Sequence, residues 1–174
     1  MTEVTEAYRD YTPPAGTRKT VEELLQSVPK EHLAGLKSVV LTNAQALTGT
    51  RKRRWSWSRG RKIRHGSEVA GLYHHATRTE PAWVEIFVEK AYVGVPSWAL
   101  RLPFVRDATM GSVLYHEVGH HIHATQSPEY REREAVADAW KRRLSRLHVR
   151  RRHSVIRLLF QPVAWLRSLR RSSH

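Results

Sequence analysis

The residues whose types and spacing can do chemistry lie in the stretch His116-Glu117-Val118-Gly119-His120. This stretch is inside an apolar run from near Met110 to near Ser127, which we predict to be a helix. On a helix, a spacing of four residues places both imidazoles on one face, one turn apart, where they can bind one zinc ion. The carboxylate of Glu117 then lies beside them. It can take a proton from a water on the metal, which generates a hydroxide nucleophile near neutral pH.

A catalytic zinc site also needs a third protein ligand and an open position for water. Ser127-Pro128-Glu129 has the residue types of a helix start, so we predict a second helix from Pro128 to about His148. On this helix Glu134 and Asp138 are four residues apart and share a face. Glu134 can therefore complete the metal shell, while Asp138 accepts the free ring N–H of a ligand histidine. Small side chains on the same helix favour close packing of the two helices: Ala135, Ala137 and Ala139.

The two motifs, His116 to His120 and Glu134-x-x-Ala-Asp138, together resemble the signature of the gluzincin metallopeptidases. The resemblance is to members with an E-x-x-A-D second motif, found in membrane-linked heat-shock and prenyl-protein endopeptidases and in small soluble minigluzincins. It covers about Val69 to Leu147, and the gap between the motifs is short, as in the minimal forms. The roles it implies are zinc ligands for His116, His120 and Glu134, general base for Glu117, and partner of a ligand histidine for Asp138.

The remaining patterns predict the elements that position this site. Thr20-Val21-Glu22-Glu23 has capping-box spacing and opens a helix that runs to about Ser27. A short helix from Lys30 to Leu36 then leads into a strand at Val39-Val40-Leu41. Residues 69–74 and 82–88 read as two antiparallel strands joined by a turn, because apolar residues alternate along the second of them.

We therefore expect an α+β fold of the zincin-like type. It consists of an N-terminal helix, a small mostly antiparallel sheet and two packed metal-binding helices. The chain of 174 residues is long enough for one domain with a real core and too short for two sizeable ones. The expected divisions are a flexible arm (1–19), a zincin-like metallopeptidase domain (20–147) and a basic amphipathic C-terminal segment (148–174).

Charge is the most unusual feature of the composition, with a formal net charge of +14. Residues 51–64 hold eight basic side chains and no acid, and residues 141–174 hold eleven and no acid. Such segments attract anionic partners in a salt-dependent way. Trp55 and Trp57 lie among the arginines of the first segment, where they can stack on bases, enter a membrane interface or fold back on the sheet from a solvated loop. Candidate partners are thus nucleic acid or an anionic membrane surface, through 51–64 and 141–171.

The absence of cysteine excludes disulfides and thiolate chemistry and leaves zinc to nitrogen and oxygen ligands. It is compatible with a reducing cytoplasm. The N-terminal residues have neither a basic leader nor an apolar core of a signal peptide, and no apolar run reaches the roughly 20 residues of a transmembrane helix. We expect a cytoplasmic protein, either free or peripheral at a membrane or nucleic acid.

The function we expect is zinc-dependent hydrolysis of peptide bonds in a protein or peptide substrate, with zinc as cofactor. A function of another class is the alternative: a basic nucleic-acid- or membrane-surface-binding protein with a structural or inactive metal site. A strand just upstream of the motif helix can serve as the edge to which an extended peptide adds, or it can be purely structural.

The sequence does not decide the roles of several neighbouring side chains. Either His74 or His75 can stabilise an oxyanion, although a histidine at a strand end is more often solvated. His121 points about 100 degrees away from His120 on an ideal helix, so we do not make it a ligand. Trp98 and Phe104, in the long connection before the motif helix, can line the cleft or anchor the connection.

Overall fold

The computed structural model describes residues 2–48, 55–58, 61–64, 69–126 and 133–152, with backbone alone for the two four-residue pieces. Its main sheet has the strand order β1-β2-β6-β5. These strands are β1 (Glu3–Ala7), β2 (Leu36–Thr42), β6 (Ala82–Phe87) and β5 (Gly71–His74). The pairs β1–β2 and β2–β6 are parallel, and β5–β6 is antiparallel. The fold is therefore α+β with a small mixed sheet.

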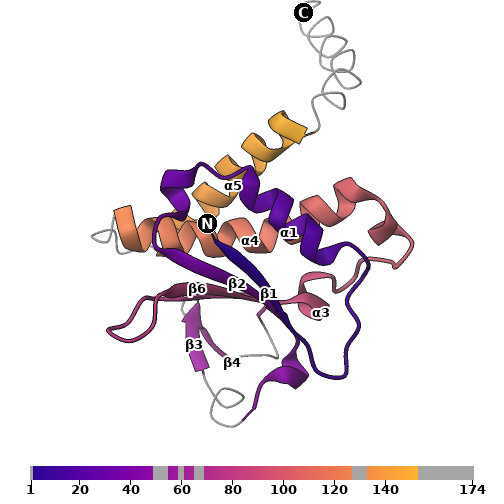
Figure 1. Cartoon of the computed structure of the whole chain (residues 1–174), viewed down its shortest axis with the longest axis horizontal. Helices are drawn as coiled ribbons and strands as arrows, with labels where there is room; N and C mark the ends of the chain where they lie inside the picture. The colour runs from indigo at the N-terminus through magenta and orange to yellow at the C-terminus, as the bar shows by residue number, and fades with distance from the viewer. Residues whose placement is uncertain (1, 49–54, 59–60, 65–68, 127–132, 153–174) are drawn as a thin grey trace, which may run out of the picture.

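Helices form a layer on one face of this sheet (Figure 1). The longest is α4 (Pro103–Gln126), which packs against α1 (Thr17–Gln26) and against the strands β5 and β6. The other long helix, α5 (Arg133–Arg152), packs along α4. A one-turn helix, α3 (Val88–Ala91), continues directly from β6. The layer places α4 between the sheet and α5.

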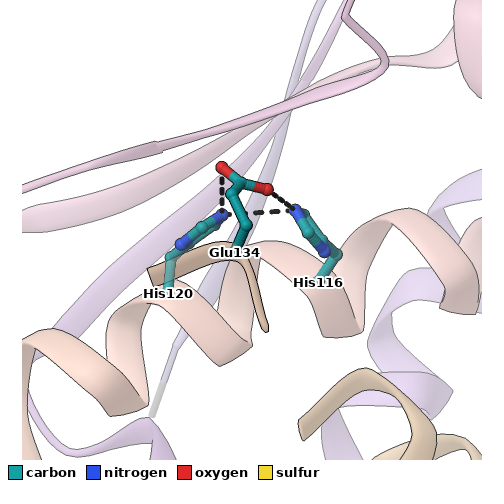
Figure 2. A group of neighbouring side chains, drawn as sticks. All are labelled: His116, His120 and Glu134. Atoms are coloured by element: carbon teal, nitrogen blue, oxygen red, sulfur yellow. Dashed lines mark hydrogen bonds and ion pairs between the residues drawn. The ribbon is translucent and has the colours of Figure 1, made fainter. Parts of the chain in front are cut away.

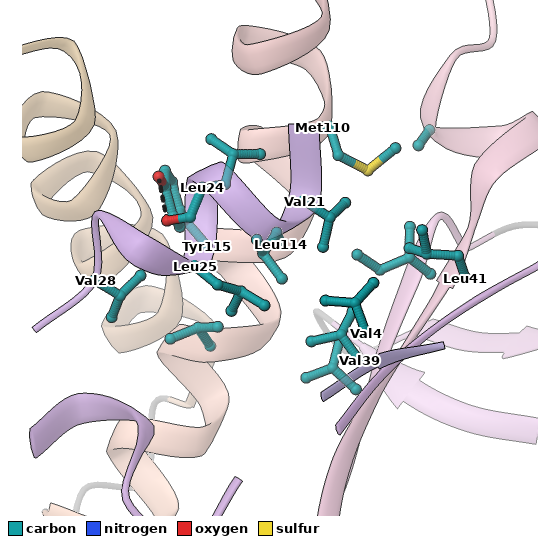
Figure 3. Close-up of a cluster of buried hydrophobic side chains, with 14 of the residues drawn as sticks. Val4, Val21, Leu24, Leu25, Val28, Val39, Leu41, Met110, Leu114 and Tyr115 are labelled. Carbon is teal, nitrogen blue, oxygen red and sulfur yellow. Dashed lines mark hydrogen bonds between the residues drawn. The ribbon is translucent and has the colours of Figure 1, made fainter. Parts of the chain in front are cut away.

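The core lies between the helix layer and the sheet (Figure 3). Alternate residues of the central strands point into it and are fully buried: Val39, Leu41, Val84 and Ile86. Helix α1 adds Val21 and Leu24, and α4 adds Met110, Leu114 and Tyr115. The buried hydroxyl of Tyr115 hydrogen-bonds Ser27 Oγ at 2.7 Å and donates to the Leu24 carbonyl at 3.2 Å, so its polar end is satisfied. The part of α4 just before the motif is thus held by the strands of the sheet and by α1.

The N-terminal residues are the first departure from the sequence prediction. Residues 1–19 were predicted to be a flexible arm, but Glu3–Ala7 forms the edge strand β1, and α1 begins at Thr17. Val4 is the one core residue of this strand, so its side chains give almost no apolar alternation. Its stability comes from backbone pairing with β2 and from Asn43, whose side chain accepts from the Arg9 N–H and donates to the Arg9 carbonyl.

The sheet was predicted to be mostly antiparallel, but two of its three strand pairs, β1–β2 and β2–β6, are parallel. Strand β1 is joined to β2 through α1, and a connection that crosses over in this way makes the two strands parallel. The antiparallel pairing of residues 69–74 with 82–88 is confirmed in β5 and β6. Their turn is closed by the Thr77 N–H, which donates to the Glu80 carbonyl at 2.8 Å.

Helix α4 begins earlier than the sequence indicated, at Pro103, a position in the first turn where a missing N–H costs no hydrogen bond. Asp107 and Thr109 have residue types that suit a helix cap, but both lie inside α4. Asp107 has another role. Its side chain is buried between α4 and α5, and its Oδ2 lies 3.3 Å from His148 Nε2 and 3.3 Å from Arg152 Nε, both on α5. A buried carboxylate needs such partners, and here they join the two helices.

Two predictions fall largely outside the described residues. They are the start of the second helix at Ser127-Pro128-Glu129 and the C-terminal segment from residue 153 onward.

Within 51–64, the strands β3 (Trp55–Ser58) and β4 (Arg61–Arg64) pair as an antiparallel hairpin. A solvated loop had been the alternative to a binding role for this segment. In the described part of the chain, no helix is both long enough and apolar enough to cross a membrane.

Candidate metal centre

Three side chains from two helices converge on one point (Figure 2). His116 and His120 lie on one face of α4, and Glu134 reaches them from the first turn of α5. His116 Nε2 is 3.2 Å from His120 Nε2 and 3.4 Å from Glu134 Oε2, and His120 Nε2 is 3.8 Å from Glu134 Oε1. Among the described residues, these form the group of histidine and carboxylate side chains arranged to hold a metal ion.

The spacing of these atoms fits a tetrahedral metal ion. Ligand bonds of roughly 2.0 to 2.2 Å at tetrahedral angles require ligand atoms about 3.3 to 3.6 Å apart. His116 Nε2 lies 3.2 Å from His120 Nε2 and 3.4 Å from Glu134 Oε2, close to this range, while the 3.8 Å contact of His120 is to the other carboxylate oxygen, Oε1. One atom from each residue would fill three corners of such a tetrahedron and leave the fourth for water or substrate.

The protonation of the two imidazoles also favours a cation at this point. Asp138 Oδ1 lies 3.1 Å from His116 Nδ1, and since a carboxylate only accepts, the Nδ1–H of His116 donates to it. In the neutral ring, His116 Nε2 is then a lone pair directed at the cluster. Burial, with the neighbouring His116 next in importance, lowers the pKa of His120 to about 4, so this ring is neutral at pH 7. A neutral imidazole can offer its unprotonated ring nitrogen to a metal ion, so both rings suit ligation.

Asp138 is itself held in place from the other side. Lys141 Nζ lies 3.0 Å from the same Oδ1 atom that faces His116, one turn further along α5. The carboxylate therefore bridges an ammonium and an imidazole, which fixes both the tautomer and the orientation of the His116 ring. The spacing of Glu134 and Asp138 predicted this arrangement, whereas the part played by Lys141 was not predicted.

Glu117 lies on the sheet side of α4, in a closely packed environment. The residue is only 6% exposed, and burial followed by the nearby Glu134 raises the pKa of its carboxyl group to about 8. The backbone N–H of Tyr73 in β5 donates a hydrogen bond to it, which acts in the opposite direction. A carboxyl group with these contacts can accept and return a proton near neutral pH.

The close approach of β5 to Glu117 depends on Gly71. A Cβ atom at this position would lie 2.8 Å from both Cγ and Oε1 of Glu117 and 2.8 Å from Val113. Any side chain at residue 71 would therefore displace the Glu117 carboxylate or push β5 off the helix. Nothing in the sequence around Gly71 signalled this contact, because it joins residues 46 positions apart.

The approach of α5 to α4 depends on the glycine inside the motif itself. A Cβ on Gly119 would lie 2.8 Å from both the Cα and the carbonyl oxygen of Ala137. Ala137 is fully buried, in agreement with the prediction that a small residue allows close packing, whereas Ala135 and Ala139 are exposed. Because Ala137 is three residues from Glu134, this contact sets how far Glu134 can reach.

Gly119→Ala is therefore expected to destabilise the fold and to weaken metal binding. Alanine favours a helix interior by about 1 kcal/mol over glycine. The overlap is with backbone atoms that cannot rotate away, however, so α5 must shift, at a cost of about 1–3 kcal/mol. Urea unfolding without metal measures the net change in stability, and a zinc titration measures the loss of affinity.

The control for this substitution is Ser112→Ala, at an exposed position of the same helix. It adds the same residue without a clash, so stability and metal affinity should stay at or slightly above those of the parent. A Gly119→Ala protein that binds metal as tightly as the parent would show that the Gly119 contact does not position Glu134.

The neighbouring histidines have distinct surroundings. His121, excluded as a ligand from its direction on the helix, is buried and donates from Nε2 to the Ala34 carbonyl at 2.9 Å. Its Nδ1 is 3.2 Å from the Tyr73 hydroxyl, which can donate to it. His74 stacks on Trp83 and lies 3.2 Å from Glu85. His75 contacts the Tyr73 ring and is close enough to His120 to lower its pKa, so His75 is the member of the pair nearer the centre.

Comparison with protein-family models, with curated proteins and with solved structures finds no significant match to this chain. The resemblance to gluzincins therefore stands on the two motifs and stays a prediction.

Proposed function

We propose that this chain is a zinc-dependent endopeptidase of the gluzincin type. The observation that carries the proposal is the convergence of His116, His120 and Glu134, whose ligand atoms lie within 4.8 Å of one another, with Glu117 at the adjacent position of α4. Two nitrogen ligands and one oxygen ligand suit zinc. Within the part of the chain that the structure describes, three protein ligands meet rather than four, which favours a catalytic over a structural role.

The chemistry divides between the ion and the side chains around it. When bound, zinc supplies a Lewis acid that polarises the scissile carbonyl and acidifies water. Glu117 accepts the proton of the attacking water and returns it to the nitrogen of the leaving amine. Asp138 holds the His116 ring in the tautomer that presents Nε2 to the metal. The Tyr73 N–H orients the Glu117 carboxylate.

The position of β5 supports an extended peptide as the substrate. Among the described strands, β5 is at the edge of the main sheet, and Gly71 lies against Glu117. The Phe87 N–H donates to the Ala70 carbonyl, so residues 70, 72 and 74 pair with β6 while the backbone of residues 71 and 73 faces away from it. A peptide bound along this edge would pass the Glu117 carboxylate.

Removal of the metal tests the proposal directly. Protein loaded with about one equivalent of zinc is expected to cleave an unfolded protein substrate. A chelator should abolish the cleavage, and added zinc should restore it, because the ion supplies the Lewis acid. Electrophoresis of the substrate and mass spectrometry of the fragments measure the reaction, and circular dichroism confirms that the chelated protein is folded.

The nucleic-acid-binding alternative gives the opposite result. A chain that binds one zinc ion and shifts DNA or RNA in a salt-dependent manner, yet cleaves no unfolded protein or peptide, would replace the proposed function with that one. Cleavage that persists with chelator would indicate a contaminating hydrolase or a metal-independent reaction, and it would also reject the proposal.

A further inference from the structure

The connection between α3 and α4 carries a concentration of exposed apolar side chains that the metal centre does not use. Five large hydrophobic residues are strongly exposed in the described part of the chain, and four of them lie between residues 93 and 104. Two are more than half exposed, Val93 at 70% and Trp98 at 67%, and the others are Leu102 and Phe104. Neither Trp98 nor Phe104 is buried as an anchor of the connection. We call these four residues the apolar cluster.

The local fold holds these side chains on the outside. A 3₁₀ turn, Ala99–Arg101, directs Ala99 and Leu100 into the protein, so the residues on either side of it, Trp98 and Leu102, face outward. Arg106 fixes the turn, since its Nη1 donates to the Leu100 carbonyl at 2.7 Å. The backbone is also closed on itself, because the Ala99 N–H donates to the Pro96 carbonyl and the Leu102 N–H to the Ala99 carbonyl.

Along the segment that carries the apolar cluster the charged residues are basic, while the acids that border it are held by other elements: Glu89 accepts from the Ala44 N–H, and Asp107 is buried against α5. From Lys90 to Arg106 the sequence contains three basic residues, with Arg101 in the middle, and no acidic residue. Arg101 is exposed beside Trp98 and Leu102. The whole chain carries a formal net charge of +14. A partner that covers the cluster must therefore tolerate tryptophan and phenylalanine at its surface and carry negative charge around them.

We propose that the apolar cluster docks this protein on the surface of an anionic lipid bilayer. Tryptophan and phenylalanine favour the boundary between headgroups and acyl chains, while arginine and lysine bind the anionic headgroups above it. The N–H groups of Ala99, Leu100 and Leu102 are hydrogen-bonded within the connection, so these donors carry no desolvation penalty into the apolar layer. Attachment is peripheral, through inserted side chains.

This docking leaves the metal centre outside the lipid. Phe104 and His116 are separated by twelve residues of α4, which is about 18 Å along the helix axis. In Figure 1 the connection from α3 joins α4 at its N-terminal end, whereas the cluster of ligands lies further along the same helix. The inference does not depend on the chemistry of that centre.

The first test is sedimentation of the full chain with vesicles of phosphatidylcholine and phosphatidylserine, compared with phosphatidylcholine alone. The parent should bind the anionic vesicles, and the double variant Trp98→Ser with Phe104→Ser should bind at least about tenfold more weakly. The control is Ala76→Ser, which changes an exposed apolar side chain between β5 and β6, outside the basic segments, and should bind like the parent. Equal binding by the double variant would overturn the proposal.

The second test separates this surface from the other basic segments of the chain. Because the chain has no cysteine, Trp98→Cys and Ala76→Cys each accept one environment-sensitive fluorophore. On anionic vesicles the emission of the label at 98 should shift to shorter wavelength and that of the label at 76 should not. No shift at 98 while the protein sediments with vesicles would show that another surface binds.

Light scattering without lipid completes the test. A parent that is monomeric supports docking on lipid. A parent dimer that the double variant converts to a monomer would assign the cluster to a second copy of the chain and reject the lipid surface.

Discussion

Replacement of Glu117 by glutamine is expected to leave the metal bound and to remove peptide hydrolysis. Glutamine has nearly the size of glutamate, so it can stay against Gly71 and accept the Tyr73 N–H through its side-chain oxygen. It cannot take a proton from water. General-base catalysis contributes about 10²–10⁴-fold to rate, and the variant should lose at least that much. Turnover of an unfolded protein, with zinc content by mass spectrometry, measures both properties in one sample.

Glu80→Gln is the matched control, because Glu80 lies exposed on the turn between β5 and β6 and makes its hydrogen bonds to Thr77 through the backbone. It should change neither zinc content nor turnover. Full activity in purified Glu117→Gln would reject Glu117 as the base. Loss of zinc together with activity would instead assign Glu117 a role in holding the site.

Replacement of a ligand is expected to remove the metal and the activity together. Glu134→Gln is the sharper variant, since it keeps the shape of the side chain but removes the charge that α5 brings to the two imidazoles. We expect zinc affinity to fall by more than about 100-fold, because the ion is left with two nitrogen ligands and no anion. His116→Ala should have at least as large an effect, and it also removes the imidazole that Asp138 contacts. Competition with a chromophoric chelator measures both affinities.

Unfolding without metal separates loss of a ligand from loss of the fold. Glu134 is partly exposed and its contacts in the structure are to the two histidines, so the metal-free Glu134→Gln protein should unfold at nearly the same urea concentration as the metal-free parent. A variant that still binds one equivalent of zinc with parental affinity would show that Glu134 is not a ligand, and the constellation would have to be reassigned.

The two helices that carry the candidate site could be predicted because their signals are local. The four-residue spacing of His116 and His120, and that of Glu134 and Asp138, determines which side chains share a face once the helix is assumed. The structure brings His116, His120 and Glu134 together as this spacing predicted. The catalytic and metal-binding roles of these residues are still proposals, which the variants above test.

The features that were missed depend on contacts between distant parts of the chain. Strand β1 has a single core residue, Val4, so its position is set by backbone pairing with β2 and not by a side-chain pattern. Asp107 has a residue type that suits a helix cap, yet its partners are on α5, about 40 residues away. Gly71 is a similar case, because its role becomes visible only when β5 lies against Glu117.

Helix α5 is held differently at its two ends. Its last residue, Arg152, forms ion pairs with Glu23 of α1 and with Asp107 of α4, while its first turn carries Glu134. Under the proposed function, a bound ion strengthens the contacts that Glu134 makes with His116 and His120 of α4, and an ion present at 100 times its dissociation constant adds about 2.7 kcal/mol to the folded state. Loss of the ion would therefore weaken the attachment of the first turn of α5, and metal-bound molecules could then cleave the metal-free protein there. Autolysis would then remove the unloaded molecules first.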